Sequence, residues 1–187
     1  MTKAETDKAN EIEGTTMVFQ YGSNCSDTQI NGKDRLKGDA RFISIAETVD
    51  DYELAFDVFS NGRHCAAADI VQKPGGKVWG VLYEIPQYLI GRSTAQACGR
   101  KSLDAIEGEG ANYERREIDV RTPDGKITTA LTYTVRNPRT GLKTDIDYVR
   151  FIVSGLRQRG IPGEYIAEVK MIARLNNPDI ANQIDAL

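Results

Sequence analysis

Hydrophobic residues recur at every second position through much of the chain, a spacing typical of strands with one buried face. The most regular alternation runs over residues 127–135, where Ile127, Leu131 and Val135 share one face. Shorter stretches of the same kind, rich in β-branched and aromatic residues, predict the other strands. These strands are predicted over residues 17–21, twice within 41–60, and over 66–71, 78–85 and 113–121.

Near the end of the chain the hydrophobic spacing changes to three or four residues, which predicts helices. Two helices are expected, with apolar faces over residues 146–156 and 165–175. Residues 86–106 are predicted to be helical in parts, with Gly108 following the last helical turn. Ser26 and Gln29 have the spacing of a capping box, which predicts a short helix beginning there.

The order of these elements, strands first and helices packed at the end, favours one α+β domain with a mostly antiparallel sheet. We expect this domain to span residues 15–187. Residues 1–14 are polar and show no periodicity, so they are predicted to form a flexible arm.

Composition excludes several classes of protein. Apolar residues make up 40% of the 187 residues and charged residues 27%, which is typical of a globular chain. The formal net charge is −3, so a basic surface for nucleic acid is not expected. No apolar run is long enough for a membrane-spanning helix.

Cysteine and histidine usage narrows the chemistry further. The three cysteines, Cys25, Cys65 and Cys98, lack the spacing of a disulfide framework, so free thiols in the cytoplasm are expected. Cys98 is predicted to be buried, the usual environment of a free thiol. His64 is the single histidine, which rules out a zinc site with two histidines. No metal or cofactor is expected.

The turn Tyr21-Gly22-Ser23-Asn24 follows a predicted strand and precedes a predicted helix. Backbone N–H groups at such a position are free to hold a carboxylate or a developing oxyanion. The alternative is an ordinary connection between strand and helix.

Glu107 is predicted to be the last residue of a helix, beside its apolar face and before Gly108. The negative end of the helix dipole and partial burial both raise the pKa of a carboxyl group, as a general base near neutral pH requires. The alternative is a solvated glutamate at a helix end. The pair Arg115-Arg116 is expected on the surface of a strand, with a contact to a substrate carboxylate as the alternative.

Three motifs together resemble the γ-glutamylcyclotransferase family, also called AIG2-like. The segment Phe19-Gln20-Tyr21-Gly22-Ser23-Asn24 resembles its YGSN-type loop. Residues 77–85, KVWGVLYEI, resemble its VWGVLYE-type strand, and residues 103–108, LDAIEG, followed by Tyr113, resemble its LDxxEG…Y block. Their order and spacing agree with the family from about Met17 to Leu175. Gln20, Cys25 and the long N-terminal segment depart from the family pattern.

The resemblance implies a small β-barrel flanked by helices, with Glu107 as the catalytic glutamate. It also implies that substrate binds to residues from four parts of the chain. These residues are Tyr21, Gly22, Ser23, Asn24, Tyr113, Tyr133 and Tyr148.

The family reaction releases 5-oxoproline from a γ-glutamyl amide and needs no metal or cofactor. The resemblance thus implies a small γ-glutamyl substrate, with Glu107 taking a proton from its α-amine and returning one to the leaving amine. The loop N–H groups would hold either the γ-carbonyl oxyanion or the α-carboxylate. Cys25 and residues 28–62 are expected to line the side of the leaving group. Two other functions remain open: a non-catalytic binding module, and a biosynthetic enzyme that removes a γ-glutamyl protecting group.

Overall fold

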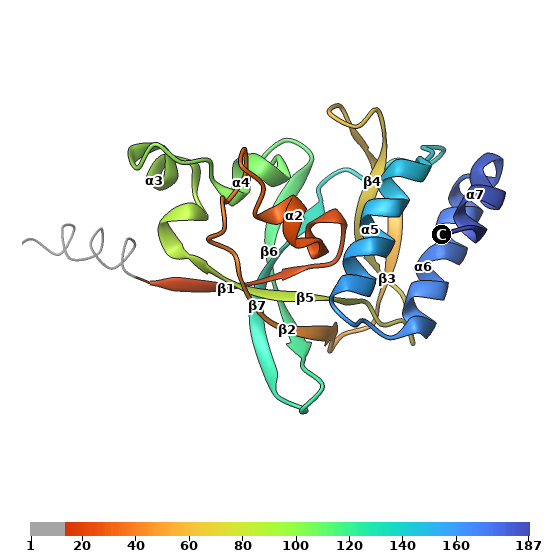
Figure 1. Ribbon diagram of the computed structural model, residues 1–187, viewed down its shortest axis with the longest axis horizontal. Coiled ribbons are helices and arrows are strands. Elements are labelled where there is room, and N and C mark those ends of the chain that lie inside the picture. The colour runs from red at the N-terminus through yellow and green to blue at the C-terminus, as the bar shows by residue number, and fades with distance from the viewer. Residues whose placement is uncertain (1–13) are drawn as a thin grey trace, which may run out of the picture.

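The computed structural model describes residues 14–187, and its core is a small barrel of five strands (Figure 1). The barrel strands are β1 (Thr15–Gln20), β5 (Trp79–Pro86), β2 (Arg41–Thr48), β6 (Tyr113–Arg121) and β7 (Ile127–Val135), in spatial order. Neighbouring strands are antiparallel, and β7 returns to β1 through one parallel pair, Val18 with Leu131. This confirms the predicted mixed, mostly antiparallel architecture. The arm predicted over residues 1–14 lies outside the described residues, apart from Gly14.

A separate hairpin, β3 (Tyr52–Ser60) with β4 (Cys65–Gln72), stands beside the barrel. Strand β3 carries the regular alternation of buried and half-buried residues that predicted it, whereas β4 is buried over its first six residues. Asp57 falls at a bulge in the pairing, between Phe56 and Val58. The hairpin packs against β7 on one side and a C-terminal helix on the other, so its turn end is free to form one wall of a pocket.

Short helical elements connect the strands on the barrel's upper side in Figure 1. They are η1 (Ser23–Cys25), α2 (Asp27–Ile30), η2 (Gln87–Leu89), α3 (Arg92–Ala97) and α4 (Leu103–Glu107). The helical parts predicted within residues 86–106 are therefore confirmed. The capping box is wrong in its contacts: Ser26 is the N-cap of α2, but its hydroxyl pairs with that of Thr28 rather than with the backbone.

The two predicted C-terminal helices are α5 (Ile146–Gln158) and α6 (Gly163–Asn176). They are followed by η3 (Pro178–Ile180) and α7 (Ala181–Asp185), which the apolar spacing did not predict. Residues 14–187 contain no helix that is both long and apolar enough to cross a membrane.

Helix α5 lies directly against the loop after β1. Gly155 makes this approach possible, because a Cβ added there would lie 2.7 Å from the backbone nitrogen of Ser26. Contacts this short do not occur for real side chains without displacement of the neighbouring backbone. Helix α5 thus supports the segment that carries the YGSN loop.

The cysteines differ in burial. Cys25 and Cys65 are buried, whereas Cys98 is exposed, so the prediction of a buried Cys98 is wrong. Cys98 is the C-cap of the short helix α3 and precedes Gly99, which has a positive φ of 64°. Its side chain leaves the helix at a turn that faces solvent rather than the core.

Candidate active site

A pocket of about 520 Å³ opens where the loop after β1, the end of α4 and the β3–β4 turn meet. Its walls are lined by Ser23, Asn24, Arg35, Val58, Ser60, Asn61, Gly62, Arg63, Ala67, Ala105, Ile106, Glu107, Gly108, Asn112 and Tyr113. The predicted catalytic glutamate is therefore within the pocket, together with residues from the segment expected to face the leaving group.

Local sequence places Glu107 at the last position of α4. Ser102 caps the beginning of this helix by accepting a hydrogen bond from the backbone of Ala105, at 3.1 Å. Gly108 ends it with a left-handed conformation, φ 70°, which glycine adopts most readily. A helix of five residues, capped at both ends, thus presents one carboxylate to the pocket.

The carboxylate of Glu107 accepts two hydrogen bonds from side-chain amides. Gln20 Nε2 lies 2.9 Å and Asn24 Nδ2 2.7 Å from the same oxygen, Oε1. Arg35 donates from Nη2 to Asn24 Oδ1 at 2.6 Å. Because guanidinium groups only donate, this contact directs the amide oxygen of Asn24 to Arg35 and its nitrogen to Glu107.

Burial raises the pKa of Glu107 above its ordinary value of 4.5. The nearby charge of Arg35 and the hydrogen bonds from Asn24 and Gln20 act in the opposite direction and limit the rise. The net upward direction gives the carboxylate a greater affinity for a proton than a solvated glutamate has.

A second, small cavity of about 30 Å³ adjoins the pocket beneath the YGSN loop. Its walls are Gln20, Tyr21, Gly22, Ser23, Asn24, Ala68, Glu107, Tyr113 and Tyr133. All the predicted loop residues line this cavity, and Glu107 lies at its junction with the larger pocket. A Cβ on Gly22 would make ordinary van der Waals contacts, with Ala68 Cβ at 3.4 Å and with the Tyr148 hydroxyl at 3.5 Å.

Two of the predicted tyrosines hold the same backbone unit of β4. Tyr113 donates from its hydroxyl to the carbonyl of Ala68 at 2.7 Å, and the Tyr148 hydroxyl accepts from the N–H of Ala68 at 3.0 Å. Tyr113 lines both cavities, whereas Tyr148 is not among the lining residues of either. The position of Tyr148 fits support for the cavity wall more directly than contact with a ligand.

The other two tyrosines are linked to each other and to α4. Tyr21 donates to the backbone carbonyl of Tyr133 at 2.5 Å, and Tyr133 donates from its hydroxyl to Asp104 Oδ1 at 2.8 Å. Asp104 is buried and is also paired with Arg115, whose Nε lies 2.8 Å from Oδ1. Burial is the main cause that raises the pKa of all four tyrosines, so their hydroxyls stay protonated near neutral pH.

Arg115 lies on the strand surface, as expected, but its guanidinium is engaged by Asp104. Neither it nor Arg116 lines either cavity, which favours the surface position over a contact to substrate. The arginines at the pocket are instead Arg35 and Arg63.

Sequence reasoning singled out neither arginine, although Arg35 falls within residues 28–62, because each lies in a loop with no hydrophobic periodicity. Arg63 stacks over the rings of Tyr148 and Phe151, with 5.0 and 5.1 Å from Cζ to the centroids, and donates to Gln29. Gln20 was seen only as a departure from the family pattern, although its amide contacts Glu107.

Cys25 was expected to line the pocket, but it is not among the lining residues. Its thiol is fully buried and donates to the backbone carbonyl of Gln20 at 3.0 Å. Burial raises the pKa of this thiol to about 12. Cys25 is thus a core residue. Across residues 14–187, no group of three or more His, Cys, Asp or Glu side chains is arranged to hold a metal ion.

Comparison with known proteins agrees with this fold and site. Residues 18–151 match the family model for γ-glutamyl cyclotransferase, AIG2-like. The γ-glutamylcyclotransferase of Mus musculus is 30% identical over 166 residues, which cover 86% of this chain and 80% of the relative. That of Homo sapiens is 29% identical with the same coverage.

Solved structures show the same similarity. A γ-glutamyl cyclotransferase superposes with a TM-score of 0.67 at 26% identity, covering 83% of this chain and 86% of the other. A human protein described as uncharacterized gives 0.70 at 29% identity, with 84% and 88% covered. The family model and the curated relatives, which match over most of the chain, identify this barrel protein as an enzyme. The chain belongs to the γ-glutamyl cyclotransferase, AIG2-like family.

The raised pKa of Glu107 predicts how its replacement changes stability. Between pH 4.5 and the higher pKa in the fold, the native state binds more protons than the unfolded state, so stability falls as pH rises. Glu107→Gln removes this titration. We expect the variant to melt at a higher temperature than the wild type at pH 8, with the difference shrinking by pH 4. Groups that titrate in both proteins affect both melting temperatures equally and cancel in the comparison. If the difference in melting temperature grew toward acid pH, the raised pKa of Glu107 would be contradicted.

Proposed function

We propose that the enzyme cyclises a γ-glutamyl amino acid to 5-oxoproline and releases the free amino acid, with Glu107 as general base and then general acid. The observation that supports this most is the environment of Glu107. Its carboxylate lies between the large pocket and the small cavity, and burial raises its pKa. A pure binding module has no need of such a group at that place.

The reaction moves two protons from the α-amine nitrogen to the leaving nitrogen. The substrate α-amine is an ammonium at neutral pH and cannot attack until a base removes a proton. Glu107 takes this proton, and the free amine nitrogen forms a bond to the γ-carbonyl carbon. Glu107 passes this proton to the leaving nitrogen of the tetrahedral intermediate and takes the second proton from the ring nitrogen. The bond between the γ-carbon and the leaving nitrogen then breaks as the carbonyl re-forms, and Glu107 gives the second proton to the released amine, which leaves as an ammonium while Glu107 returns to its carboxylate form. Because nucleophile and carbonyl belong to one molecule, the enzyme mainly orients them.

The hydrogen bonds to Glu107 suit this task. Both amide donors are on Oε1, and within residues 14–187 no side chain or backbone group donates to Oε2. Oε2 is therefore the oxygen we assign to proton transfer, while Oε1 fixes the orientation of the group. The first N–H groups of the turn at Gly22 and Ser23 would hold an anionic oxygen of the γ-glutamyl group.

Charge at the pocket favours a leaving group with a carboxylate. Arg35 and Arg63 bring two positive charges and Glu107 one negative charge, so these three groups sum to +1. A γ-glutamyl amino acid carries one ammonium and two carboxylates, which sum to −1, whereas a γ-glutamyl amide of a simple amine is neutral. Opposite net charge favours binding and correct orientation.

Glu107→Gln keeps the size of the side chain and can still accept both amide bonds, but it cannot take a proton. We expect 5-oxoproline formation to fall by about 10² to 10⁴ in kcat, the usual contribution of general acid–base catalysis, with KM nearly unchanged. The assay is 5-oxoproline release from a set of γ-glutamyl dipeptides, glutathione and γ-glutamyl-ε-lysine. Turnover of the variant at the wild-type rate would overturn the role of Glu107.

The leaving-group assignment is tested with two substrates that differ only in a carboxylate, γ-glutamyl-alanine and γ-glutamyl-ethylamine. Arg63→Gln should raise KM for the alanine compound by about tenfold or more, the effect of losing a charged hydrogen bond, and change the ethylamine compound little. Arg116→Gln, a surface cation away from the pocket, serves as the control. Equal effects of Arg63→Gln on both substrates would contradict a carboxylate contact.

A further inference from the structure

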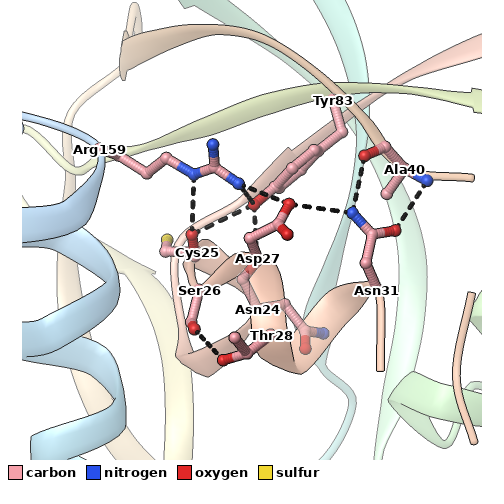
Figure 2. A network of polar contacts seen from close by, with 9 residues as sticks. All are labelled: Asn24, Cys25, Ser26, Asp27, Thr28, Asn31, Ala40, Tyr83 and Arg159. Atoms are coloured by element: carbon pink, nitrogen blue, oxygen red, sulfur yellow. Dashed lines mark hydrogen bonds and ion pairs between the residues drawn. The ribbon is translucent and has the colours of Figure 1, made fainter. Parts of the chain in front are cut away.

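A network of polar contacts joins α5 to the loop after β1 (Figure 2). Its centre is Arg159, the C-cap residue of α5, whose side chain is 13% exposed. The guanidinium donates to the carbonyl of Cys25 at 3.4 Å, to Asp27 Oδ1 at 2.9 Å and to the Tyr83 hydroxyl at 3.3 Å. Arg159 lines neither cavity of the site, so any effect on catalysis acts through other residues.

The first branch of the network runs through Tyr83 to the YGSN loop. Tyr83 belongs to β5 and is fully buried, and its hydroxyl lies 3.2 Å from the carbonyl of Asn24 and 3.1 Å from that of Cys25. Because Arg159 can only donate, it occupies the oxygen of this hydroxyl and leaves its hydrogen for the loop carbonyls. The backbone of Asn24 is thereby held while its side-chain amide contacts Glu107.

The second branch runs through Asp27 to the loop that carries Arg35. Asp27 Oδ1 accepts from Arg159 and, at 3.0 Å, from Asn31 Nδ2. Asn31 in turn binds both backbone groups of Ala40, donating to the carbonyl at 3.0 Å and accepting from the N–H at 2.9 Å. This double contact closes the loop over residues 31–40, as Figure 2 shows.

Both branches therefore end on partners of Glu107. One fixes Asn24, whose amide donates to the carboxylate, and the other fixes the loop of Arg35, which orients that amide. We propose that Arg159 is a positioning residue for the cyclisation, which holds Asn24 and Arg35 against Glu107 through Tyr83 and Asp27. This inference rests on the proposed function of Glu107.

The position of Arg159 at the end of α5 gives it the reach to serve both branches. Its guanidinium also stacks over the rings of Phe42 at 4.5 Å and Tyr83 at 5.6 Å. These contacts restrict the planar group to one orientation, in which separate N–H groups face separate acceptors. A lysine at this place would keep the charge but could not occupy the three acceptors with the same geometry.

The test compares variants of Arg159 through the pH dependence of kcat/KM, measured per mole of folded protein. Arg159→Met keeps the apolar stem and removes the donors. Because Asn24 and Arg35 both lower the pKa of Glu107, we expect the acidic limb to move to higher pH by about half a pH unit or more. We also expect kcat to fall about tenfold, with a smaller change in KM. Arg159→Lys should be intermediate between Arg159→Met and the wild type in both kcat and the position of the acidic limb. Tyr83→Phe should also move the acidic limb to higher pH.

The control is Arg150→Gln, on the same helix, which removes an exposed ion pair with Asp147. It should match the wild type in both rate and pH profile. If Arg159→Met and Tyr83→Phe lose activity only in proportion to their folded fraction, with an unchanged acidic limb, Arg159 supports the fold alone and the proposal is wrong.

A measurement without turnover separates this proposal from the proposed function. The melting temperatures of Glu107→Gln and its parent are compared at pH 4 and pH 8, in the wild-type and Arg159→Met backgrounds. If the difference in melting temperature changes more between pH 4 and pH 8 in the Arg159→Met background, Arg159 positions the partners of Glu107. This result would support the proposal even if the wild type formed no 5-oxoproline. An equal difference in both backgrounds would overturn it, whatever the activity.

Discussion

The site depends on one hydrogen bond, from Asn24 Nδ2 to Glu107 Oε1, which joins segments 83 residues apart in the sequence. Without it, the hydrogen bond from Gln20 Nε2 would be the other side-chain contact that holds the carboxylate of Glu107. The bond requires that the amide of Asn24 face the right way and that its loop stay in place. Arg35 meets the first requirement by occupying the amide oxygen, and the support of the loop by α5 and β5 meets the second.

The barrel and its short helices hold the Asn24 loop and Glu107 close to each other. The barrel brings the end of β1 close to β7, so that the hydroxyl of Tyr21 reaches the backbone of Tyr133 and the hydroxyl of Tyr133 reaches Asp104 on α4. Asp104 and Glu107 are one helical turn apart, and the ion pair of Asp104 with Arg115 anchors that turn to β6. The two acidic residues of α4 are in different electrostatic environments. The carboxylate of Asp104 forms an ion pair with Arg115, whereas burial raises the pKa of Glu107, as proton transfer requires.

Much of this could be predicted from sequence, for a physical reason in each case. Alternation of apolar residues reports which face of a strand is buried, and it located β7 and β3. The spacing of Leu103, Ile106 and Gly108 placed Glu107 at a helix end. Contacts between distant loops leave no such periodic signal, so the contacts of Arg35, Arg63 and Arg159 were not predicted. Cys25 was expected at the side of the leaving group, but its thiol is buried and donates to the backbone carbonyl of Gln20.

The central claim is that the fold leaves Glu107 with a raised proton affinity while two amides hold it in place. The direct test is a titration of its side-chain carboxyl carbon by NMR, on protein labelled with ¹³C-glutamate, with the signal assigned by its absence in Glu107→Gln. The account predicts a midpoint above the ordinary value of 4.5. A midpoint at or below 4.5 would show a carboxylate stabilised in its charged form, and would contradict the account of how this site prepares its base.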